Sequence, residues 1–139
     1  MLIEILFLLV LCIISVSDIK YRRIPNYLII IMAIFGIISL FAEGFPQERI
    51  IGCIFPAIVL WAFKKRHHIG FGDIKLTIVI GLYYGYLQSS VILICALLLA
   101  ACYGQFLKRI KHWEIKTVPL APFVCVFCLL VSILRKIFF

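Results

Sequence analysis

The apolar residues of this chain come in long blocks, without the two- or 3.6-residue alternation that marks a strand or helix with one face in water. An α-helix rises about 1.5 Å per residue, so blocks of this length approach the bilayer core of about 30 Å. Lipid offers backbone N–H and C=O groups no partner, and helices satisfy these groups internally. The pattern therefore predicts an all-α, polytopic membrane protein with about six transmembrane helices. The expected blocks are Leu2–Ser17, Tyr27–Ala42, Ile50–Phe63, Leu76–Tyr86, Leu87–Leu107 and Val118–Leu134.

We interpret residues 1–139 as a single domain, because no repeat, low-complexity tract or soluble linker interrupts the blocks. The boundary between the fourth and fifth blocks is the least defined, since it rests on the polar, glycine-containing stretch YYGYLQSS. Several blocks are shorter than about 20 residues, so we expect some helices to be recessed, tilted or shielded by neighbours. The first block has Glu4 as its early charge and lacks a small-residue cleavage site, so it is expected to be a mature helix.

Composition and charge agree with a membrane location. The 139 residues are 65% hydrophobic and 14% charged, whereas about a quarter of the residues in a soluble domain are charged. Eleven of the 14 basic residues fall in or beside the first, third and fifth loops, which are therefore expected on the cytoplasmic side, with both termini outside. Basic loops beside anionic lipid account for the net charge of +8, so no nucleic-acid partner is expected. The eleven are Lys20, Arg22, Arg23, Lys64, Lys65, Arg66, Lys75, Lys108, Arg109, Lys111 and Lys116.

Cysteine and histidine do not predict a metal site. All six cysteines lie inside the apolar blocks, and the Cys125-x-x-Cys128 pair has no second pair in a polar loop. Because structural zinc takes four ligands, packing thiols are the better interpretation. His67 and His68 are adjacent and have only Asp73 as a hard ligand nearby, so they are interpreted as part of a solvated loop. Their charge near neutral pH is one way of tuning a neighbouring acid.

Two of the six acidic residues stand out by position. Under this topology Asp18 ends the first helix and Asp73 begins the fourth, both at the cytoplasmic edge of the membrane. An ionisable group in such a place is a functional candidate. The structural alternative is that Asp18 is a polar helix stop and Asp73 an N-cap, with Lys20 or Lys75 as salt-bridge partners.

The residues around each aspartate favour a functional role. In SDIKYRRIPN, Pro25 forces a turn and Asn26 is expected to cap the second helix. In GFGDIK, Gly70 and Gly72 permit positive φ and close backbone approach, which suits a substrate strand laid beside Asp73.

Together these two motifs resemble the type IV prepilin peptidase family, membrane aspartic proteases with a Gly-x-Gly-Asp motif. The resemblance covers nearly the whole chain and implies that Asp18 and Asp73 are the catalytic pair. It also implies that Gly70 and Gly72 shape the backbone beside the scissile bond and that Lys75 lines the cytoplasmic edge. The stretch VPLAPF is similar to the family's proline-rich segment at Pro119 and Pro122, although Leu120 and Ala121 depart from the more usual Phe-Gly.

What this resemblance implies is a peptidase of a prokaryotic cytoplasmic membrane. Such enzymes cut the basic leader from type IV pilin or pseudopilin precursors at the cytoplasmic face, and these precursors are the expected partners. Two carboxylates that share one proton can activate water and polarise a peptide carbonyl together, so no metal or cofactor is needed. The chain opens on a membrane helix and lacks paired Cys-x-x-Cys motifs near its start, so a peptidase-only form without an N-terminal methyltransferase-type domain is expected.

Two other classes of function remain open from the residues alone. A small transporter or proton relay could use the same two acids, but it predicts carboxylates near the bilayer midplane and interrupted helices at matching points of two inverted halves. A noncatalytic membrane assembly subunit is the other alternative, and the complete aspartate pair argues against it.

Overall fold

The computed structural model describes residues 2–43, 47–67, 70–111 and 118–138, and this part of the chain is helical without strands. The expected all-α class is confirmed there. The helices are α1 (Leu2–Tyr21), α2 (Asn26–Glu43), α3 (Gln47–His67), α4 (Phe71–Tyr84), α5 (Tyr86–Lys111) and α6 (Ala121–Phe138).

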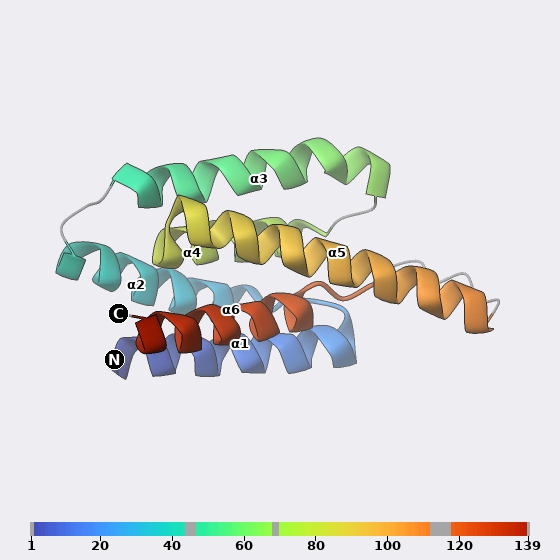
Figure 1. Cartoon of the computed structure of the whole chain (residues 1–139), viewed down its shortest axis with the longest axis horizontal. Coiled ribbons are helices and arrows are strands. Elements are labelled where there is room, and N and C mark those ends of the chain that lie inside the picture. Colours follow the sequence, from blue (N-terminus) through green and yellow to red (C-terminus); the bar gives the residue numbers. More distant parts are fainter. Residues whose placement is uncertain (1, 44–46, 68–69, 112–117, 139) are drawn as a thin grey trace.

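The helices run back and forth to form one bundle. Figure 1 shows that α1, α3 and α5 end, and α2, α4 and α6 begin, toward the same end of the bundle, which we call the odd-loop end. Both termini lie toward the opposite end. This arrangement agrees with the expectation that the first, third and fifth loops share one side.

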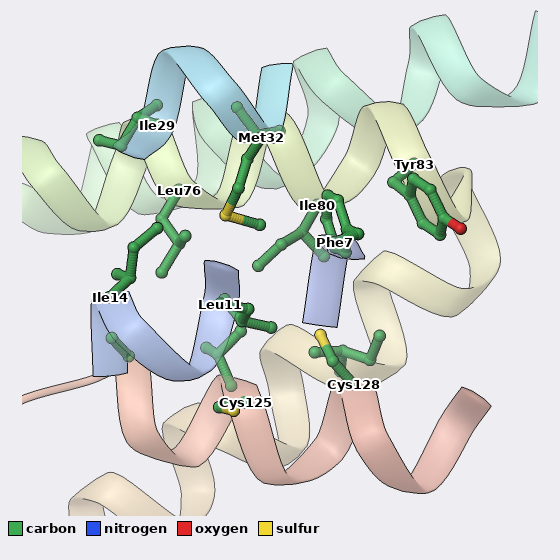
Figure 2. Packing of buried hydrophobic residues seen from close by; sticks show 14 of the residues in the cluster. Phe7, Leu11, Ile14, Ile29, Met32, Leu76, Ile80, Tyr83, Cys125 and Cys128 are labelled. Carbon is green, nitrogen blue, oxygen red and sulfur yellow. The ribbon is translucent and has the colours of Figure 1, made fainter. Parts of the chain in front are cut away.

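The helix α4 lies at the centre, although it is the shortest of the helices described. It packs against α2, α3 and α5, while α1 packs against α2 and α6. Most of the α4 side chains from Leu76 to Tyr84 are buried. Figure 2 shows Phe7 and Leu11 of α1, Met32 of α2, Ile80 of α4 and Cys128 of α6 meeting in this core. The Phe7 ring of α1 stacks on the Tyr83 ring of α4, with the two ring centroids 4.2 Å apart.

The outer surface of the bundle is strongly apolar. Two helices in the described ranges are long and apolar enough to cross a membrane, α1 over Leu2–Tyr21 and α5 over Tyr86–Leu107, and Asn26–Ala42 is a shorter apolar helix. A water-soluble monomer rarely exposes large contiguous apolar patches. Large side chains more than 60% exposed occur on each of the six helices described and include Leu2, Tyr27, Trp61, Phe71, Leu87 and Ile137.

Buried backbone and polar contacts close the bundle away from the odd-loop end. A Cβ atom built on Gly81 of α4 would overlap the Gly52 carbonyl of α3, so the two backbones touch. Nearby, the buried guanidinium of Arg49 donates a 2.8 Å hydrogen bond to Ser39 Oγ. The α4 helix ends at Gly85, which adopts φ 80° and whose N–H donates to the Gly81 carbonyl. This residue separates the fourth and fifth helices within the polar stretch that the sequence left least defined.

Candidate active site

A pocket of about 340 Å³ opens at the odd-loop end, and both aspartates line it. The helix ends that the sequence separates by 55 positions are therefore brought together. The pocket is bounded by the end of α1, the turn into α2 and the first turn of α4. Its lining residues are Asp18, Arg22, Arg23, Ile24, Asn26, Gly70, Phe71, Gly72, Asp73 and Lys75.

Asp18 lies in the last turn of α1 and is only 6% exposed. Its Oδ2 atom accepts a hydrogen bond of 3.3 Å from the backbone N–H of Ala121, the first residue of α6. The helix ends just beyond it, where Arg22 takes the left-handed conformation with φ 50° and its N–H donates to the Asp18 carbonyl at 2.9 Å. A left-handed residue of this kind is the common way to terminate a helix, although glycine usually fills the position.

Asp73 is the third residue of α4, and its carboxylate accepts a hydrogen bond from the N–H of Gly70 at the helix N-cap. An acid that reaches back from this position satisfies a donor that the helix leaves free. Burial, followed by the neighbouring Asp18 charge, raises the pKa of Asp73 to about 6, and the Gly70 bond opposes this rise. The two carboxyl groups are thus coupled electrostatically, as expected of a pair that shares a proton.

Neither glycine of the GFGD motif has the positive φ that the sequence led us to expect. Gly70 has φ −69°, and Gly72 lies inside α4 and is not among the positive-φ residues. The approach of a substrate strand to these glycines stays a prediction, and the close contacts that the structure shows at them are made by the chain itself. A Cβ on Gly72 would lie 3.2 Å from Ile24 Cβ, and one on Gly70 would lie 3.3 Å from Asp73 Oδ2. Gly72 therefore lets the first turn of α4 pack against the loop that follows Asp18.

A polar bridge joins the two motif segments at the pocket edge. Lys75 Nζ donates a 3.1 Å hydrogen bond to Asn26 Oδ1. The expectation that Asn26 caps α2 is wrong, because the helix begins at Asn26 itself and its side-chain oxygen faces Lys75 instead. The structural alternative of salt bridges also fails, since no ion pair within the described residues joins either aspartate to Lys20 or Lys75.

The remaining predicted residues lie beside the pocket or outside the described part. Pro25 forms the turn before α2, where its carbonyl accepts from the Leu28 N–H at 3.2 Å. Pro119 and Pro122 flank the start of α6 and do not line the pocket. The side chains of His67 and His68, which the sequence offered as tuning groups, lie outside the described residues.

Sequence reasoning missed three contributors to the site. Ile24 and Phe71 lie within the two motifs but were not among the predicted site residues, and both line the pocket as apolar side chains. Ala121 was noted only as a departure from the family's usual residue, although flanking prolines are a recognisable signal for a helix start. Its contact with Asp18 crosses 103 positions of sequence and has no local signature.

Metal ligands do not gather in the described part of the chain, where no group of three or more His, Cys, Asp and Glu side chains forms a site. All six cysteines are free thiols, and the Sγ atoms of Cys12 and Cys125 lie 3.5 Å apart between α1 and α6. The pocket thus offers two coupled carboxyl groups, backbone N–H donors and a basic rim as its chemical groups.

Comparison with known proteins gives one match. The family model described as "Type IV leader peptidase family" matches residues 5–105, a range that contains both aspartates. No curated protein and no solved structure matches the chain.

Proposed function

The chain belongs to the type IV leader peptidase family, and we propose that it is a membrane-embedded aspartic endopeptidase with Asp18 and Asp73 as its catalytic pair. The observation that carries this proposal is the shared pocket: two carboxyl groups from α1 and α4 line one cavity, and the Asp18 charge disfavours ionisation of Asp73. The expected substrates are type IV pilin or pseudopilin precursors, which meet the enzyme as a basic leader followed by an apolar stem.

The proposed peptide hydrolysis uses the Asp18 and Asp73 carboxyl groups, which share one proton. The ionised carboxylate takes a proton from water while the water oxygen attacks the peptide carbonyl carbon, and the protonated carboxyl donates its proton to the carbonyl oxygen. The tetrahedral diol then collapses, the C–N bond breaks, and the leaving nitrogen takes up a proton. The two carboxyl groups return to the singly protonated state for the next cycle.

The pocket's place in the bundle supports cleavage at the cytoplasmic face. It lies at the odd-loop end, where Arg22, Arg23 and Lys75 line its rim, and the positive-inside rule puts such an end in the cytoplasm. All six helices are proposed to lie in the bilayer, with the shorter α4 shielded by its neighbours. A proton relay would place its acids near the midplane, so the position of both aspartates at one end favours the peptidase.

The proposal is tested with purified protein in lipid nanodiscs and a panel of leader-bearing pilin-like precursors, with cleavage followed by mass spectrometry. We expect Asp18→Asn and Asp73→Asn each to lower the cleavage rate by at least about 100-fold, because each removes one half of the proton transfer. Glu48→Gln is the matched control, since Glu48 is an exposed acid at the opposite end of the bundle. Thermal unfolding of each variant shows that it is folded.

Two results would count against the proposal. Cleavage that survives either aspartate substitution removes that residue from the mechanism. A folded wild-type protein that cuts none of the precursors removes the peptidase proposal for this substrate class and favours the noncatalytic alternative.

A further inference from the structure

The start of α6 delivers a backbone donor to the catalytic pair. Ala121 is fully buried, and its N–H donates to Asp18 Oδ2 at 3.3 Å. The Leu120 carbonyl accepts from the Val124 N–H at 3.2 Å, so Ala121 is the first residue within the helix. The first N–H groups of a helix have no partner inside it. This one is satisfied by the carboxylate of a helix at the other end of the sequence.

The local sequence leaves few other donors at this point. Pro122, the next residue, has no N–H, and Pro119 restricts the approach to the helix. The helix packs against α1 along an interface in which the sulfur atoms of Cys12 and Cys125 lie 3.5 Å apart. The Ala121 N–H is therefore directed at Asp18 by packing along the whole α1–α6 interface.

Resting on the proposed peptidase function, we infer that the Ala121 peptide N–H is a positioning group that makes Asp18 the ionised member of the pair, leaving the shared proton on Asp73. A backbone N–H only donates, so it stabilises a carboxylate more than a protonated carboxyl. It occupies Oδ2 of Asp18 and leaves Oδ1 for the attacking water.

The surroundings of Asp73 agree with this assignment. Its pKa is raised to about 6 in spite of the Gly70 N–H, through burial and the Asp18 charge. The other charged side chains that line the pocket are Arg22, Arg23 and Lys75. In the proposed step Asp18 accepts the proton of water as the C–O bond forms, and the Asp73 proton moves to the carbonyl oxygen.

The experiment removes the N–H and keeps the helix. Ala121→Pro suits the purpose because proline is well tolerated at the first helical position. Ala121→Val is the matched comparison, with the same number of side-chain heavy atoms and an intact N–H. The substrate is a synthetic peptide with a basic leader followed by an apolar stem, cut by full-length protein in nanodiscs across a range of pH.

We expect kcat of the proline variant to be about 10- to 100-fold below that of the valine variant, with KM similar in the two. The active pair carries one proton, so the acidic limb of the pH–rate profile reports ionisation of Asp18. Losing the donor makes that ionisation harder, and the limb is expected about 1 pH unit higher in the proline variant. The basic limb, which reports loss of the Asp73 proton, is expected to stay in place.

The inference is overturned if kcat is equal in the two variants, or if kcat of the proline variant falls while the acidic limb of its pH–rate profile stays in place. The peptidase function stands in either case. A wild-type protein that cuts nothing fails the proposed function, and the inference fails with it. Should the proline variant not fold, hydrogen exchange of the Ala121 amide in ¹⁵N-alanine-labelled protein replaces it. Faster exchange in Asp18→Ala than in wild type supports the contact, and equal exchange overturns it.

Discussion

The two ends of the bundle handle buried polar groups in opposite ways. Away from the odd-loop end, α3 and α4 touch backbone to backbone at Gly52 and Gly81, and the Arg49 guanidinium is held by Ser39. At the odd-loop end, Asp18 and Asp73 share an open pocket in which each carboxylate accepts from a backbone N–H. One end is packed to hold helices together, and the other keeps space beside charged oxygens.

The difference separates stability from chemistry within one small chain. Close packing without voids stabilises a fold, whereas two neighbouring buried carboxyl groups destabilise it. The contacts away from the odd-loop end fix the positions of α3 and α4. The pocket end can therefore hold two neighbouring carboxyl groups that repel each other when both are ionised. Substitutions at the two ends are therefore expected to change different properties of the protein.

The largest effect on stability is expected from Gly81→Ala at the closed end. The new Cβ would overlap the Gly52 carbonyl, and a backbone atom cannot rotate away, so α3 must move. We expect the free energy of unfolding to fall by about 3 kcal/mol or more. Gly72→Ala is the counterpart at the pocket end, where the contact is the Ile24 side chain at 3.2 Å, and a loss of about 1 kcal/mol is expected. Denaturation in mixed micelles measures both, and equal losses would contradict the comparison.

The second prediction is a gain in stability, from a substitution at the pocket end. The pKa of Asp73 is raised from 3.8 to about 6, so the folded protein favours the protonated form. Below about pH 3 this residue is protonated in both folded and unfolded chains, and above about pH 6 the folded chain carries the buried charge. Asp73→Asn is therefore expected to be more stable than wild type by about 3 kcal/mol at pH 8, with the difference vanishing near pH 3. Unfolding across this pH range checks it, and a constant difference would refute it.

The smallest expected losses of stability come from two buried hydrogen bonds away from the odd-loop end, one from a charged group and one between neutral groups. Ser39→Ala removes an acceptor from the buried Arg49, and Ser132→Ala removes the 2.8 Å partner of the Tyr84 hydroxyl. We expect losses of about 1.5 and 1 kcal/mol respectively, because hydrogen bonds to charged groups contribute more. Cleavage by the folded fraction is expected to be unchanged in both. A lost cleavage activity in either variant would mean that the two ends are coupled.

The helices and the two aspartates could be predicted because both leave local signals. Apolar blocks located all the helices described, but they misplaced the ends, since backbone hydrogen bonding continues through polar residues. Thus α1 runs four residues past the predicted Ser17, and α4 begins at Phe71 instead of Leu76. Asp18 and Asp73 were recognisable from the turn and glycine motifs beside them.

The parts of the site that escaped prediction depend on pairs of distant residues. The role of Gly72 follows from Ile24, which lies 48 positions earlier and has to be known before the missing Cβ makes sense. Asn26 was expected to cap α2, but its side-chain oxygen accepts a hydrogen bond from Lys75 of α4 instead. Nothing in the sequence around Ala121 indicates that its N–H is directed at a carboxylate. Local patterns find the acids, and tertiary packing decides what surrounds them.

The contact between α1 and α6 also has a consequence for the order of synthesis. The ribosome makes Asp18 103 residues before Ala121, and Asp73 is likewise complete long before α6 emerges. A growing chain thus carries both acids while the donor that orients the first of them does not yet exist. Full activity is expected only when α6 docks against α1, so a protease assembled among other nascent membrane proteins stays incomplete until α6 has been made.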